Sequence, residues 1–224
     1  MYRMFQGWLA MSSTGPYEGT LLVNPLLSRA TAYFLLRPFF SPIAAPSNPS
    51  SPTYDPAYLA PSNWRLDLDP NNTWLHGATP GHGQELRHDM HPHLDLPNSM
   101  VHMPRVEPGD YVSWHCDTIH AVDSVHAGST DSSVLYIPSC PLTVGNAEFV
   151  ARQRACFLEG TPCPDFGGGV GESQHVGRPV EGSVRGVEAR RAFGLEAWDS
   201  DAEGLTTGQR EVMDRANKIL GFYD

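Results

Sequence analysis

The hydrophobic and polar positions in the first two thirds of the chain form short runs that are typical of β-strands. Met4–Met11 and Thr20–Val23 are predicted strands, and the run Gly15–Gly19 between them predicts a turn. Three further strands are expected, separated by turn residues, at Met100–Met103, Tyr111–His115 and Ser133–Ile137. Short strands at this spacing are typical of an antiparallel sandwich or barrel.

From Asn146 onward the spacing of apolar residues changes to a helical period. A helix is expected to begin with Asn146 as its cap and to end near Gly160. Two more helical segments are predicted, at Arg190–Ala197 and Gln209–Leu220. The pattern therefore divides the chain into a β-rich core at residues 1–145 and a helical extension at residues 146–224 that packs on the same domain.

Two segments of the β-rich part show no period of burial. Residues 41–63 carry six prolines with serines between them, so an exposed, extended loop is expected to interrupt the core there. Residues 76–97 are polar and rich in Gly and His, which indicates a loop that lines a cleft. Before the first loop, apolar residues within Leu26–Phe40 predict a helix that stops at Arg37–Pro38, because proline ends it.

The composition is that of a soluble globular protein and argues against a nucleic-acid partner. The formal net charge of the 224 residues is −10 at pH 7, whereas phosphate binding needs clustered Lys and Arg. The first residues lack the pattern of a signal peptide, and no stretch approaches the roughly 20 apolar residues that span a bilayer. The four cysteines lack zinc-finger spacing and are expected to be free thiols. We therefore expect a cytoplasmic protein with no membrane partner.

The histidines gather in one part of the sequence. Nine of the ten fall between His76 and His126, and the densest group is the run Trp114–His120. Histidine is the commonest metal ligand among side chains and titrates near neutrality. The run follows a predicted turn that enters a strand, so it places imidazoles at a strand end. This pattern indicates a metal or acid–base site.

Three runs of the sequence resemble a known family. They are Gly15–Pro25, Pro108–Val122 and Ser133–Pro138, the last followed by Ala151–Arg154. Over nearly all of its length the chain is identified as a member of an uncharacterised family, domain of unknown function 1479. The fold of that family is similar to clavaminate synthase and to phytanoyl-CoA-hydroxylase-like Fe(II)/2-oxoglutarate dioxygenases. The resemblance implies a mainly β fold, a double-stranded β-helix (jelly roll), with C-terminal α-helices.

The resemblance also implies a set of iron ligands. Such enzymes hold iron by an early His-x-Asp/Glu pair and a late histidine, which leaves three positions for 2-oxoglutarate and oxygen. His120 corresponds to the late histidine. The early pair is expected before the strand that begins at Met4. The chain therefore resembles the C-terminal part of a longer family member, and its jelly roll is expected to be N-terminally incomplete.

Two pairs within the chain have the spacing of the early motif. One is His115 with Asp117 and the other is His93 with Asp95. A strand period of two places each pair on one face, although His120 has the opposite parity to His115. Asp117 is also a candidate for the acceptor that orients a ligating imidazole.

The resemblance further implies an arginine that binds the carboxylate of 2-oxoglutarate. This arginine lies about ten or more residues after the late histidine and pairs with the carboxylate in a bidentate manner. The next arginine after His120 is Arg152, beyond the last predicted strand. The candidates that remain are Arg3, Arg37 and Arg105.

Three functions follow from these patterns. The leading hypothesis is Fe(II)- and 2-oxoglutarate-dependent oxidation of a small molecule. A second is a non-catalytic jelly-roll protein, degenerate or truncated. A third is a cupin-like metalloenzyme of another kind that uses the local histidines.

Overall fold

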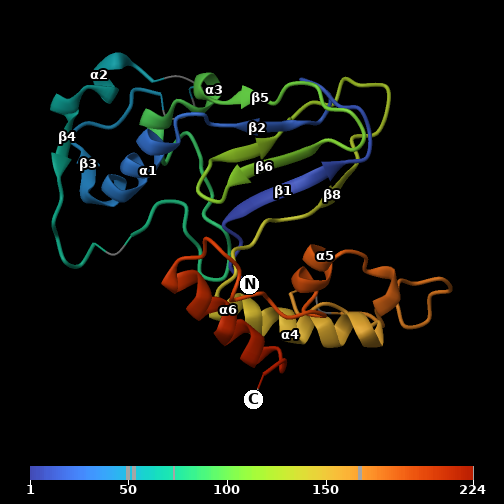
Figure 1. The fold of residues 1–224 in the computed structure, drawn as a ribbon. Helices are drawn as coiled ribbons and strands as arrows, with labels where there is room; N and C mark the ends of the chain where they lie inside the picture. Colours follow the sequence, from blue (N-terminus) through green and yellow to red (C-terminus); the bar gives the residue numbers. More distant parts are fainter. Residues whose placement is uncertain (49–50, 52–53, 73, 166–167, 224) are drawn as a thin grey trace. The chain divides into compact units, whose positions relative to one another are not determined.

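The computed structural model describes residues 1–48, 51, 54–72, 74–165 and 168–223, which fall into two compact units (Figure 1). The first, the β unit, runs from Gly7 to Ile137. The second, the helical unit, joins Met1–Gln6 to Pro138–Asp224. Two prolines of the predicted loop, Pro49 and Pro52, lie outside the described residues.

Two three-stranded sheets make up most of the β unit. One has the order β6 (Tyr111–His115), β1 (Phe5–Ala10), β8 (Val134–Tyr136), and the other has the order β5 (Val101–His102), β2 (Leu21–Val23), β7 (His120–Val122). The five strands predicted from the sequence are therefore confirmed. Strand β7 is an addition that the sequence pattern did not predict.

Alternation along the strands builds the first hydrophobic cluster. Trp8 and Ala10 of β1 lie two residues apart and are both buried, together with Leu21 of β2. Half-buried apolar side chains of β6 and β8, among them Trp114, pack against them. A strand that sends alternate residues to one face needs this pattern to bury one side of a sheet.

The register of β2 decides which side chains share a face of the second sheet. Leu22 pairs with His102 of β5 and with Ala121 of β7. Val23 pairs with Val101 and with His120. Side chains of directly paired residues point to the same side, so His102 and His120 lie on opposite faces of this sheet.

A second cluster lies under the first helix. Helix α1 (Leu27–Leu36) buries Ala30 against Leu94 and Ile119. The helix continues as a 3-10 turn at Arg37–Phe39, with Pro38 inside it, so the predicted stop at Arg37–Pro38 is confirmed.

The loop predicted at residues 41–63 is wrong in part. Its first residues belong to β3 (Phe40–Pro42), which pairs antiparallel with β4 (Trp64–Leu66). It also contains α2 (Pro56–Leu59), which Asp55 caps by accepting the Ala57 N–H, and the 3-10 turn Pro61–Asn63. Proline at the first position of a helix lacks an N–H that would be unpaired there, so prolines 56 and 61 start these elements and do not prevent them.

The predicted loop at residues 76–97 contains a tight crossing and two short helical turns. The Glu85 N–H donates to the Gly77 carbonyl over 2.8 Å, and the Gln84 side chain donates to the His76 carbonyl. The helical turns are the 3-10 turn Pro92–Leu94 and, next to it, α3 (Leu96–Ser99). The 76–85 segment is thus a closed loop whose neck is Gly77 and Glu85.

The helical unit consists of α4 (Val144–Glu159), α5 (Val187–Ala192) and α6 (Thr207–Ile219), with a 3-10 turn at Glu181–Ser183. The helix after residue 143 and the one near the C-terminus are confirmed, whereas α5 begins three residues before the predicted Arg190. Phe149 of α4 and Ala216 of α6 are almost fully buried, and these two helices pack together. The predicted cap of α4 is wrong: Thr143 accepts the Asn146 N–H, and Gly160 ends the helix in a left-handed conformation.

Asn146 has a different structural role. Its buried side chain accepts the Tyr2 N–H over 2.7 Å and donates to the Tyr2 and Pro141 carbonyls. Asn217 of α6 makes the same two-way pair with the backbone of Trp198. Each amide thus pairs with the backbone N–H and C=O of a residue, Tyr2 or Trp198, that lies outside the strands. Within the described residues, no helix has the length and apolar content needed to cross a bilayer.

The neck of the 76–85 loop should tolerate only glycine. Gly77 has a φ of 74°, and a Cβ there would lie 1.9 Å from the Glu85 carbonyl oxygen, whereas Gly81 has a φ of 80° with open space around it. Gly81→Ala should therefore lower the free energy of unfolding by about 1 kcal/mol, for the left-handed backbone alone. Gly77→Ala should lower it by ~2 kcal/mol more, because of the steric clash. Equal losses in urea unfolding would show that the neck is not tight.

Candidate functional site

The turn between β6 and β7 brings three potential metal ligands together. His115 ends β6, Cys116 and Asp117 form the turn, and the Thr118 N–H closes it by donating to the His115 carbonyl over 2.9 Å. One ligand atom from each of His115, Cys116 and Asp117 lies within 4.8 Å of the other two. We call these three residues the β6–β7 turn site.

Hydrogen bonds inside this site connect its three members. The Asp117 N–H donates to His115 Nδ1 over 3.2 Å, so the proton of a neutral imidazole lies on Nε2. The Cys116 thiol donates to Asp117 Oδ1 over 3.5 Å. Burial, and after it the bond to Asp117, raises the pKa of the Cys116 thiol. A metal ion at this site would therefore displace the thiol proton and the hydrogen bond at Nδ1.

His120 lies at the start of β7 with an exposed side chain. Its Nδ1 is 2.9 Å from the Thr118 carbonyl oxygen, to which it donates, and this leaves the lone pair on Nε2. Its ring lies 5.3 Å from that of Trp114. Among the described residues, His120 is not part of any group of three ligand atoms within 4.8 Å of one another. The structure thus joins His115 to Asp117 and leaves His120 outside their group.

The other predicted pair, His93 and Asp95, is engaged elsewhere. His93 Nε2 lies 3.1 Å from the Leu59 carbonyl oxygen, and its ring contacts Trp64. Asp95 adopts a left-handed conformation with a φ of 45° and accepts both of its hydrogen bonds from Asn98. These two side chains bind different neighbours, so the structure does not bring them together.

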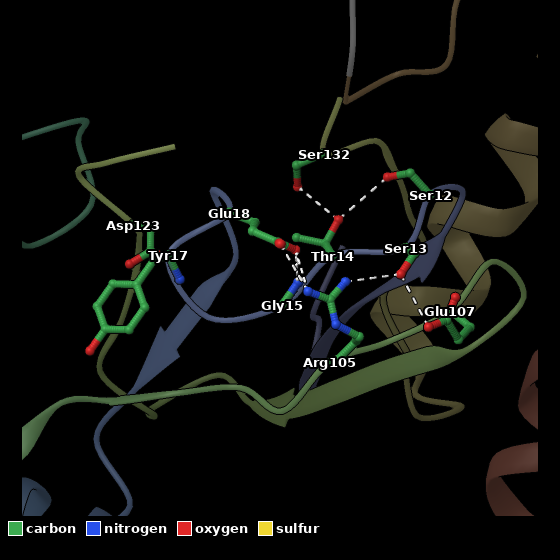
Figure 2. Close-up of polar contacts among 10 residues, drawn as sticks. All are labelled: Ser12, Ser13, Thr14, Gly15, Tyr17, Glu18, Arg105, Glu107, Asp123 and Ser132. Carbon is green, nitrogen blue, oxygen red and sulfur yellow. Dashed lines mark hydrogen bonds and ion pairs between the residues drawn. The ribbon is translucent and has the colours of Figure 1, made fainter. Parts of the chain in front are cut away.

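Two of the three candidate arginines already bind carboxylates of the chain. Arg3 forms an ion pair with Asp165 in the helical unit. Arg105 donates from one nitrogen to both carboxylate oxygens of Glu18, at 2.8 and 2.9 Å, and from another to Ser13 (Figure 2). The bond from Arg105, followed by the Gly15 N–H, lowers the pKa of Glu18.

Arg37, the third candidate, is buried at the end of α1. Its Nε donates to the Met90 carbonyl over 2.9 Å and its Nη1 to the Phe40 carbonyl over 2.8 Å. Its guanidinium lies over the Trp64 ring, 5.2 Å from the centroid. In the described part of the chain, no carboxylate lies within 4.0 Å of it.

A histidine–carboxylate pair on the second sheet was not found by sequence reasoning. His102 Nε2 lies 2.6 Å from Asp123 Oδ1, and the side chain of Asp123 is only 7% exposed. The Tyr17 N–H donates to the other carboxylate oxygen, and the Tyr17 ring lies 4.4 Å from the imidazole (Figure 2 shows Tyr17 beside Asp123). Such a carboxylate orients an imidazole and fixes its tautomer. In the sequence, the signal for this pair is that both residues lie on one face of the second sheet. That face can be assigned only when the register of β2 is known.

Two further imidazoles lie near Arg37 and are buried. His91 is fully buried and His76 is 6% exposed. Burial, followed by the charge of Arg37 and the neighbouring His91, lowers the pKa of His76 to about 4. Burial is also the main reason that the pKa of His91 is lowered. Both rings are therefore neutral at neutral pH.

Comparison with known proteins places these features in a family. The Gig2-like family matches residues 1–195. The chain is 30% identical over 196 residues to the uncharacterised protein YbiU of Escherichia coli (strain K12), covering 88% of this chain and 39% of YbiU. It therefore spans less than half the length of that relative.

Solved structures agree with this similarity. The structure of GlcNAc Inducible Gene 2 (DUF1479) from Candida albicans has a TM-score of 0.79 and 30% identity, covering 98% of this chain and 46% of the other. A candidate oxidoreductase from Salmonella typhimurium LT2 has a TM-score of 0.65 and 29% identity, covering 87% of this chain and 39% of the other. Both likenesses extend over most of this chain.

The β6–β7 turn site should bind a divalent transition metal through its thiol. Cys116→Ser should weaken Co(II) binding about tenfold or more, because the soft sulfur ligand is lost. A titration followed by the cobalt absorption spectrum measures this. Cys156→Ser, in α4, is the matched control and should bind as the unchanged chain does. Identical binding curves for the two variants would contradict the assignment.

The buried His76 should make stability depend on pH. Its pKa is about 4 in the folded chain against an ordinary value of 6.5, so between these values only the unfolded chain binds the proton. Stability should therefore rise by up to about 3 kcal/mol as pH increases from 4 to 6.5. In His76→Gln the rise, measured by urea unfolding, should be smaller. The exposed His82→Gln should keep the full rise, and equal slopes for both variants would refute the prediction.

Proposed function

The chain belongs to the Gig2-like family, and on this basis we propose that it forms part of an oxidoreductase that uses Fe(II) and 2-oxoglutarate to oxidise a small molecule. The likeness to a candidate oxidoreductase of Salmonella typhimurium LT2 supports the reaction class. The resemblance of Pro108–Val122 to the dioxygenase-like family supports the choice of metal and co-substrate.

The fold proposed for this function is a double-stranded β-helix. The two three-stranded sheets, β6-β1-β8 and β5-β2-β7, would supply strands to it. This chain would be its C-terminal part, because His120 corresponds by resemblance to the late histidine of the jelly roll. The share of YbiU that the chain covers, 39%, leaves room in that relative for the earlier strands.

The observation that carries the proposal is the cluster of donors at the β6–β7 turn. His115, Cys116 and Asp117 combine an imidazole, a thiol and a carboxylate, which are all ligands of divalent transition metals. His120 follows within five residues with its Nε2 lone pair unused by the Thr118 contact.

These residues fit an iron site in part. An Fe(II)/2-oxoglutarate site needs two imidazoles and one carboxylate, and His115, Asp117 and His120 are residues of those types. In the described residues only the first two lie together. Within the proposal, His120 holds the metal through Nε2, and Asp117 orients the ring of His115 through its backbone N–H, which donates to Nδ1.

Iron, when bound, would supply the redox chemistry, and the chain supplies position and orientation. The Thr118 carbonyl fixes the His120 tautomer, so that Nε2 is the atom that can bind a metal. The neighbouring Trp114 ring, 5.3 Å away, limits the rotation of this imidazole. Both effects lower the cost of ordering the ligand.

A second candidate function is a cupin-like metalloenzyme that does not use 2-oxoglutarate. The observation that favours it is Cys116, because a thiol in the donor group suits zinc, nickel or cobalt at least as well as Fe(II). The two candidates differ in their co-substrate. Oxygen consumption that depends on 2-oxoglutarate belongs to the first alone.

The proposal is tested by adding Fe(II), 2-oxoglutarate and oxygen to the protein. Oxygen uptake coupled to succinate release is the expected result. His120→Ala should abolish iron binding with little change in the melting temperature, since the side chain is exposed. Asp117→Ala should weaken iron binding about 10- to 100-fold, because the carboxylate beside the imidazole is lost.

The control is His175→Ala, which removes an exposed imidazole of the helical unit. Iron binding should be unchanged in this variant. Unchanged iron stoichiometry in His120→Ala would retire His120 as a ligand. Iron binding without 2-oxoglutarate-dependent oxygen uptake would favour the second candidate.

A further inference from the structure

Arg37 is a buried cation whose charge is not balanced by an acid in the described part of the chain. It is 8% exposed, and its two hydrogen-bond acceptors are the neutral carbonyls of Met90 and Phe40. A buried charge is costly unless it is paired. Carbonyl dipoles and the Trp64 ring reduce this cost, but neither supplies a negative charge.

The phenol beside Arg37 does not balance the charge either. Tyr33 interacts with the guanidinium, and burial raises the pKa of Tyr33 to about 12. The phenol is therefore neutral at physiological pH. Asp89, which acts on the neighbouring His91, forms an ion pair with Arg87 over 2.7 Å.

A buried polar atom without a partner lies near the same charge: Arg37 Nε binds the Met90 carbonyl, and the ring of the next residue, His91, lies 6.4 Å from the ring of His76. His76 is 6% exposed, and its Nδ1 is buried with no hydrogen-bond partner in the described structure. The Trp74 ring, 4.0 Å away, covers one side of this imidazole. Leaving such an atom unpaired costs the full desolvation of the group, so a partner from outside the chain is expected there.

The charge of Arg37 selects the kind of partner. A metal cation at His76 would be repelled by the guanidinium, which already disfavours a proton on both His76 and His91. An anion would be attracted to Arg37 and would accept a hydrogen bond from a neutral imidazole N–H. The two observations, one unbalanced cation and one unpaired imidazole nitrogen, are satisfied together by a single oxyanion when Nδ1 carries the ring proton.

We propose that Arg37 and His76 form a binding site for the carboxylate or phosphate group of a small molecule. The Arg37 N–H groups that do not bind Met90 or Phe40 and the Nδ1–H of His76 supply the hydrogen bonds. Tyr33 contributes a neutral hydroxyl at the same place. The proposal does not depend on the metal chemistry proposed above, although Arg37 is also one of the arginines expected from the sequence to bind a carboxylate.

The test uses metal-free protein, treated with EDTA, so that it is independent of the proposed oxidation. Sodium acetate and inorganic phosphate are titrated at constant ionic strength, with sodium chloride as the compensating salt. The readouts are the His76 ring signals in ¹H–¹⁵N NMR, assigned with His76→Gln, and the melting temperature. Saturable shifts of both readouts are expected. Saturation with acetate alone identifies a carboxylate ligand, and saturation with phosphate identifies a phosphate ligand.

Variants locate the effect at Arg37. Arg37→Met should lose the response to both anions, and Arg29→Met, an exposed arginine of the same helix α1, should keep it. If Arg37→Met does not fold, His76→Phe replaces it; this variant keeps the guanidinium and should bind the anion about tenfold more weakly. Absence of any saturable shift, or an unchanged response in the variant that is used, would overturn the proposal.

Discussion

The register of the central strand β2 is the constraint on which the chemistry of the β unit depends. Leu22 faces His102 and Ala121, so a slip of β5 alone by one residue would turn His102 to the other face of this sheet. Such a slip would separate His102 from Asp123. Burial of Leu21 in the core fixes which face of β2 points inward.

Around this sheet the protein uses its imidazoles in three different ways. At the β6–β7 turn they are accessible and stand beside a thiol and a carboxylate, as suits a metal. On the opposite face, Asp123 holds His102 in one orientation. Beside Arg37, burial keeps His76 neutral. The density of histidines in the sequence therefore reflects several local environments and not one shared centre.

Local signals in the sequence predicted much of the fold and less of the sites. Five of the strands followed from short apolar runs between turn residues, and the helices from their period, because both patterns are local. The cap of α4 was missed because Thr143 and Asn146 are both good capping residues, and the buried position of Asn146 depends on Tyr2. His102 and Asp123 are 21 residues apart and meet only through strand pairing. The lack of an acidic partner for Arg37 among the described residues could not be predicted either, because it depends on which side chains the fold places around the guanidinium.

The two buried asparagines of the helical unit make that unit sensitive to a very small chemical change. Asn146 and Asn217 each use the amide oxygen as an acceptor and the amide nitrogen as a donor. Deamidation would convert either side chain into an aspartate of nearly the same shape. The new carboxylate would face the Tyr2 or Trp198 carbonyl oxygen with no proton to share. Ageing of the purified protein would thus loosen the attachment of its first residues to α4 without altering a single apolar contact.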